Sequence, residues 1–157
     1  MPVNALVCEL CLKTGLRIDD ALDLQTKQLG KVIVIYEQKT HKKKVIRLSD
    51  DLLSKLKKIA GKYYVFEHRD DPRKHRTRQA VFLDLKRAAK AFRLDINLSP
   101  HSLRKVYAVE LLKKYGDIEK VKKALNHDNE LVTAIYCFSD VLTEQRRKEK
   151  NKRKKKH

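Results

Sequence analysis

Apolar residues recur at helical spacing along most of the chain, and three short runs are instead rich in β-branched or aromatic residues. Residues 2–13 carry apolar side chains at positions 3, 6, 7 and 10, which predicts a helix that ends at Gly15. The same reasoning predicts further helices over 19–24, 50–60, 77–92, 100–115, 117–125 and 129–137. The fold is therefore predicted to be mainly helical.

Three short runs rich in β-branched or aromatic residues predict strands. Residues 31–36 and 45–48 flank a polar turn, so together they predict a β-hairpin with a loop longer than two residues. Residues 63–66 predict a short buried strand. The expected fold class is mainly α with a small antiparallel β-sheet, that is, an α+β domain.

Charge adds a partner class to this picture. The chain has 157 residues and a net charge of +18. Residues 145–157 contain nine Lys or Arg and one Glu, so about +10 belongs to the body of the domain. A body this basic indicates a polyanionic partner, for which nucleic acid is the default. A lysine-rich surface without such a partner is the alternative.

Several classes of protein are disfavoured. The first residues do not read as a signal peptide, and no apolar run approaches membrane-spanning length, so we expect no membrane association and a cytoplasmic location. An odd number of cysteines, three, fits a reducing compartment. Cys8 and Cys11 form a CxxC pair, but no second pair of ligands stands at zinc-finger spacing. We therefore interpret them as core thiols.

The first candidate site residues are basic and lie near helix ends. His101 and Arg104 are three residues apart in the first turn of a predicted helix, where backbone N–H groups favour an anion. Arg17 lies in a turn, and its guanidinium suits phosphate because it donates two parallel hydrogen bonds. Asp20 is placed to hold that guanidinium. Solvated surface side chains are the alternative in each case.

A flexible lysine and a tyrosine complete the candidates. Lys39 lies at the tip of the predicted hairpin, from where a lysine can reach a bound strand and protonate a leaving oxygen. The sequence does not choose between Lys39 and its neighbours Lys42, Lys43 and Lys44. His127 follows a short helix, and nine residues later Tyr136 offers a phenol that surrounding cations can activate.

In their order along the chain these residues resemble the catalytic domain of the tyrosine recombinases, the phage integrase family. Residues 14–20, TGLRIDD, resemble the first arginine box, and 38–48, QKTHKKKVIRL, the hairpin with the catalytic lysine. Residues 98–108, LSPHSLRKVYA, resemble the HxxR box, and 125–136 the box that ends in the nucleophile. The resemblance covers roughly residues 1–139, and 140–157 are expected to form a basic segment, helical at first and then disordered.

The resemblance implies a role for each candidate. Tyr136 would attack the scissile DNA phosphate and form a 3′-phosphotyrosine, while Lys39 would protonate the leaving 5′-oxygen. Arg17, Arg104 and His127 would bind the non-bridging oxygens. His101 would assist proton transfer, and Asp20 would support the Arg17 side of the site. The lysines predicted to contact DNA are Lys42, Lys43, Lys44 and Lys105.

The resemblance also implies partners, and it leaves alternatives. Double-stranded DNA is the expected substrate, with self-association into a tetrameric synapse, and no metal or other cofactor is required. The family's N-terminal DNA-clamping domain is absent from this chain, so weak, salt-sensitive DNA binding is expected. Asn126 stands where the family often has glycine. The rival readings are a type IB topoisomerase, a DNA-binding domain without activity, and a metal-dependent nuclease built on Glu37-Gln-Lys39.

Overall fold

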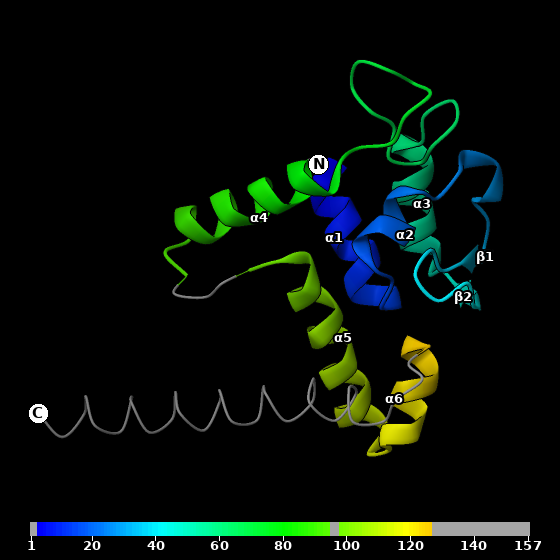
Figure 1. Ribbon diagram of the computed structural model, residues 1–157, viewed down its shortest axis with the longest axis vertical. Coiled ribbons are helices and arrows are strands. Elements are labelled where there is room, and N and C mark those ends of the chain that lie inside the picture. Colours follow the sequence, from blue (N-terminus) through cyan, green and yellow to red (C-terminus); the bar gives the residue numbers. More distant parts are fainter. Residues whose placement is uncertain (1–2, 95–97, 127–157) are drawn as a thin grey trace, which may run out of the picture. The chain divides into compact units, whose positions relative to one another are not determined.

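The computed structural model describes residues 3–94 and 98–126 (Figure 1). The chain divides into two compact units, the first ending at Arg104 and the second beginning at Lys105. The predicted helix over 129–137 and the basic segment over 140–157 lie outside the described residues. No helix in the described part of the chain is both long and apolar enough to cross a membrane.

The first unit is built around helix α1 (Val3–Thr14). This helix contacts α2 (Ile18–Leu22), α3 (Asp50–Ile59) and α4 (Arg78–Ala91). It buries apolar side chains against all three, namely Leu6, Val7, Leu10 and Cys11. A polar link fixes α1 to α4, because Asn4 Nδ2 donates a 2.7 Å hydrogen bond to Asp84 Oδ2. The central position of α1 means that the turn after it is held on several sides.

A two-stranded antiparallel sheet closes one side of this unit. Strands β1 (Val32–Tyr36) and β2 (Lys43–Arg47) follow the 3₁₀ helix η1 (Thr26–Gln28). Both strands alternate between exposed and buried residues, and the register pairs Ile33 with Ile46 and Ile35 with Lys44. One face of the hairpin therefore lies on the core and the other faces solvent. With this sheet, the predicted fold class is confirmed.

One predicted element is wrong. Residues 63–66 are not a strand: Tyr64 forms only an isolated bridge with Gln25, and Val65 N donates to Leu24 O at 2.9 Å. The ladder does not extend because the partner segment turns into η1 directly after Gln25. The prediction of burial was correct, since Val65 and Phe66 are fully buried in the core. In this segment the aromatic and β-branched residues indicated burial but not strand pairing.

The helix ends agree with the capping signals in the sequence. The Ser49 hydroxyl accepts from Leu52 N at the start of α3, and the Thr77 hydroxyl accepts from Ala80 N at the start of α4. Gly15, at φ 65°, ends α1 in the left-handed conformation that glycine tolerates best. Helix α5 (Pro100–Tyr115) has the bounds that the sequence predicted, and it begins at a proline, which lacks the N–H that the first turn leaves unpaired.

The second unit contains α5 from Lys105 onward and helix α6 (Ile118–Leu125). Its small core consists of Ala108, Val121 and Leu125, with partly buried Tyr107, Leu111 and Leu112 around it. Gly116, at φ 62°, ends α5, and the Asp117 carboxylate caps α6 by accepting from two backbone N–H groups. These caps explain why two helices follow each other so closely.

Candidate active site

The turn after α1 places Arg17 at the start of α2. Gly15 reverses the chain, Leu16 is buried in the core, and Arg17 is the extended residue that precedes Ile18. The Arg17 side chain is 20% exposed, and its Nη1 donates a 2.7 Å hydrogen bond to Glu37 Oε2. The first predicted arginine is therefore held by a residue at the end of β1.

Arg104 approaches the same place from α5. Its side chain is 4% exposed, and Nη1 donates to the carbonyl oxygen of Gly15 at 2.5 Å. The same nitrogen lies 4.0 Å from Glu37 Oε1. The predicted pairing of Arg17 with Arg104, which are 87 positions apart in the chain, is thus realised around one carboxylate. A guanidinium group carries five N–H donors in a fixed fork, the arrangement that suits phosphate oxygens.

Glu37 is the carboxylate that organises the site. It is fully buried and accepts hydrogen bonds at Oε2 from both Arg17 Nη1 and Thr40 Oγ1, each at 2.7 Å. Burial raises the pKa of Glu37, but the two hydrogen bonds and the charges of Arg17 and Arg104 outweigh it and hold the pKa below its ordinary value. Glu37 is therefore ionised at neutral pH. Sequence reasoning had placed it only in the nuclease alternative.

Asp20 supports the site differently from the prediction. The Arg17 guanidinium takes its carboxylate partner from Glu37, whereas Asp20 Oδ1 accepts from the backbone N–H of Gln38 at 2.9 Å. Asp20 thereby joins α2 to the start of the hairpin loop that carries Lys39. Burial, followed by the negative charge of Glu37, raises the pKa of Asp20 despite that hydrogen bond.

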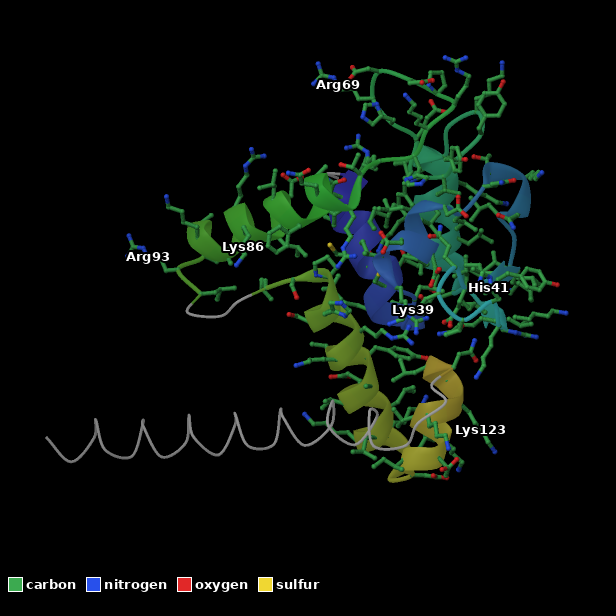
Figure 2. All side chains as sticks on the ribbon, viewed as in Figure 1. Lys39, His41, Arg69, Lys86, Arg93 and Lys123 are labelled. Carbon is green, nitrogen blue, oxygen red and sulfur yellow. The ribbon has the colours of Figure 1, made fainter. Side chains whose placement is uncertain are left out.

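His101 lies beside the arginine pair. A small pocket in the first unit is lined by Arg17, Ile18, Asp19, Arg78, Pro100, His101 and Arg104. Partial burial lowers the pKa of His101, and the positive charges of Arg78, Arg104, Lys39 and Arg17 lower it further. Lys39 is thus close enough to act on His101 electrostatically, and Figure 2 shows it on the loop between β1 and β2. The pocket suits a small anion because its charged lining is mostly cationic.

Arg78 is a pocket residue that sequence reasoning missed. It is the first residue of α4, and its Nη1 lies 3.4 Å from Asp19 Oδ2. A cation in the first turn of a helix is unfavourable with respect to the helix dipole, and that was the one local signal available. Both side chains of this pair are about half exposed, so the ion pair itself adds little stability.

The lysines predicted to contact DNA do not share one environment. Lys42 and Lys43 are exposed on the hairpin, as a direct contact with DNA requires, whereas Lys44 is buried on the inner face of β2. Lys105 is partly buried in the second unit. A DNA contact remains a prediction for all four, and the burial of Lys44 points to a different use of its charge.

Two predicted catalytic residues, His127 and Tyr136, lie outside the described residues. The structure does describe the residue that precedes them. Asn126 ends α6 at φ 53° and ψ 35°, and its N–H donates to Lys123 O at 3.1 Å. Asparagine adopts this left-handed conformation more readily than most residues. Asn126 therefore takes the cap position where the family often has glycine.

The metal-site alternatives gain no support. Glu37, the acid of the nuclease reading, is already engaged by Arg17 and Thr40. In the ranges 3–94 and 98–126 no three His, Cys, Asp or Glu residues stand close enough to hold a metal ion. Cys11 is buried in the core and Cys8 packs against it, as the core-thiol interpretation predicts. Burial raises the pKa of Cys8 to about 11 and that of Cys11 still further.

Comparisons with known proteins agree with this geometry. The profile of the phage integrase family matches residues 2–141. A tyrosine recombinase of Thermosipho africanus is 31% identical over 129 residues, which cover 78% of this chain and 44% of the relative. The tyrosine recombinase XerA of Pyrococcus horikoshii is 26% identical over 142 residues, which cover 85% of this chain and 49% of XerA. The chain spans about half the length of these curated relatives.

Solved structures agree in fold. The site-specific recombinase XerH, bound to a palindromic difH substrate after cleavage, superposes with a TM-score of 0.72 at 23% identity. That match covers 85% of this chain and 41% of XerH. Family profile, relatives and fold point the same way as the two arginines that meet at Glu37: the chain belongs to the phage integrase family.

Proposed function

We propose that this chain is the catalytic domain of a site-specific DNA recombinase that cleaves and rejoins DNA strands through a 3′-phosphotyrosine intermediate. The observation that carries the proposal is the meeting of Arg17 and Arg104 at Glu37, with His101 in the same pocket. Two guanidinium groups held by a buried carboxylate are preorganised donors for the oxygens of a phosphodiester. Double-stranded DNA supplies that ester, and XerH, a structural neighbour, is bound to a DNA substrate.

The proposed reaction needs a nucleophile, a base and a proton donor. The Tyr136 hydroxyl gives its proton to His101 while its oxygen bonds to phosphorus, and Lys39 gives a proton to the 5′-oxygen as the bond from phosphorus to that oxygen breaks. Arg17, Arg104 and His127 stabilise the charge that develops on the non-bridging oxygens. The phosphotyrosine keeps the energy of the ester bond, so the 5′-hydroxyl can attack it in the reverse step. We propose that no metal ion takes part.

A trapped covalent intermediate tests this proposal. The full chain would be incubated in low salt with duplexes that have randomised half-sites and a nick next to the cleavage position. The nick is needed because the short strand released by cleavage is then lost, which prevents religation. We expect an SDS-resistant protein–DNA adduct that forms in EDTA and disappears in Tyr136→Phe. The matched control is Tyr115→Phe, which changes an exposed tyrosine at the end of α5 and keeps the adduct. An adduct that persists in Tyr136→Phe, or that requires magnesium, would refute the mechanism.

Assembly and site choice complete the proposal. The recombinase would act on DNA as a self-associated tetramer, as the family resemblance implies. A recombinase cleaves at a defined site, whereas a type IB topoisomerase relaxes supercoiled plasmid without one, so the DNA sequences captured in the adduct distinguish these two activities. One enriched half-site is the outcome expected for a recombinase.

A further inference from the structure

Two neighbouring lysines on β2 have opposite environments. Lys43 is exposed, whereas Lys44 is 8% exposed and belongs to the inner face of the strand. Its partner in the register is Ile35, which is buried as well. Lysine is among the residues least often buried, because taking an ammonium group out of water is costly. Something in the structure must offset that cost.

The offsetting charges are those of the arginine site. Glu37 and Asp20 favour the charged form of Lys44, whereas Arg104 and Arg17 oppose it. Among the described residues, Glu37 Oε1 and Asp20 Oδ2 are buried without a hydrogen bond. Each carboxylate therefore has one buried oxygen that no hydrogen bond stabilises, and the charged form of Lys44 stabilises it electrostatically. Burial and the two arginines lower the pKa of Lys44 to about 8.

Five residues form one charge cluster in which all but Arg17 are buried, namely Arg17, Asp20, Glu37, Lys44 and Arg104. It contains three cations and two carboxylates, so its formal charge is +1. Without Lys44 the two carboxylates would balance the two arginines, and the cluster would be neutral. A phosphodiester carries one negative charge, which the complete cluster can neutralise.

We infer that Lys44 is a positioning residue of this site, whose charge offsets Asp20 and Glu37 and so leaves the arginine pair a net positive charge for one phosphodiester. This inference rests on the proposed function. It separates Lys44 from Lys39, which reaches the DNA from the hairpin loop, and from the exposed lysines that contact phosphates directly. Lys44 acts through the arginines and touches no substrate atom.

A pH profile follows from this role. Among the residues that the structure describes, the charged groups that act on Lys44 are Arg17 from the turn before α2, Asp20 from α2, Glu37 directly after β1 and Arg104 from α5. Lys44 loses its proton as the pH rises above about 8, and the cluster then becomes neutral. DNA affinity should fall over the same range. Bound phosphate favours the charged lysine, so binding at pH 8 to 9 should be accompanied by proton uptake.

The test compares matched lysine variants of the full chain. Binding of a fluorescent 30-base-pair duplex would be followed by anisotropy in low salt between pH 6.5 and 9.5. At pH 7, Lys44→Met should weaken binding roughly tenfold, whereas the exposed control Lys43→Met should cost roughly threefold or less. Wild type and Lys43→Met should lose DNA affinity above pH 8. Lys44→Met should show no such loss, and Lys44→Arg should bind DNA equally well at the lowest and the highest pH of the range. Equal losses in the two Met variants, or a pH step retained in Lys44→Arg, would overturn the inference.

A second substitution distinguishes charge balance from direct contact. Lys44→Met with Glu37→Gln again has a formal cluster charge of +1, so we expect it to regain most of the lost affinity. A lysine that touched DNA directly would not be replaced in this way, and absence of recovery would contradict the inference.

Stability gives a readout that does not depend on DNA. Glu37→Gln should lower the urea midpoint less in the Lys44→Met background than in wild type, because fewer cations remain unbalanced. An equal shift in both backgrounds would overturn the charge-balance role itself. If wild type bound no DNA while this coupling was present, the proposed function would fail and the charge balance would stand.

Discussion

The role of Glu37 leads to a prediction whose size follows from the geometry. In Glu37→Gln the amide oxygen can replace Oε2, which accepts from both Arg17 and Thr40 at 2.7 Å. What is lost is charge assistance, about 1 kcal/mol for each bond. The free energy of unfolding at pH 7 should therefore fall by about 2 kcal/mol. The amide nitrogen then takes the place of Oε1, which lies 4.0 Å from Arg104 Nη1. Two donors would face each other there, which lowers the stability further.

The pH dependence has a defined sign. The pKa of Glu37 is lower in the folded chain than its ordinary value of 4.5, so its contribution is present above that value. It is lost as the pH falls through the folded pKa, and there wild type and Glu37→Gln should become equally stable. Urea denaturation from pH 7 down to pH 3 measures this difference. Asp70→Asn, at an exposed ion pair, is the control and should change stability by less than about 0.5 kcal/mol. A loss in Glu37→Gln below about 0.5 kcal/mol, or one that does not vary with pH, would refute the reasoning.

Three further predictions concern the core, a helix end and the pocket. Leu10→Ala should cost about 2–5 kcal/mol in urea denaturation, because Leu10 is fully buried, whereas Leu12→Ala, on the same helix but 36% exposed, should cost clearly less. Gly116→Ala should cost about 1 kcal/mol from backbone strain alone, since φ is 62° and a Cβ there meets no atom within 4 Å; an unchanged midpoint would contradict this. By NMR titration His101 should have a pKa below 6.5, and Arg78→Met should raise it; no change would mean that Arg78 does not act on the pocket.

The sequence predicted the parts of this fold that depend on local signals. Gly15 marks the end of α1 through a cap that involves only neighbours in the chain. The β-branched residues of β1 and β2 and the polar turn between them indicated the hairpin directly. The failure at residues 63–66 shows the limit: burial was visible, but whether a partner strand was available depended on Gln25, far away in the sequence.

In the candidate site, too, local motifs predicted some residues, whereas the long-range contacts could be seen only in the folded chain. Arg17 and Arg104 were predicted from their motifs, and the structure brings them together. The motifs did not show what holds them, because Glu37 acts over 20 and 67 positions of sequence. Within a run of four similar lysine candidates, only the strand register separates the buried Lys44 from its exposed neighbours. Long-range contacts and register are properties of the folded chain, and residue type alone does not encode them.

The most direct test of the central claim is a double-mutant cycle on adduct formation. Arg17→Lys and Arg104→Lys each keep the positive charge but remove the forked donor, so each should slow the trapping of the nicked duplex, by roughly 10²–10³-fold. If both guanidinium groups hold one phosphate, the double variant should be far less impaired than the product of the two single effects. Single effects that multiply fully, or rates equal to wild type, would contradict a shared phosphate site.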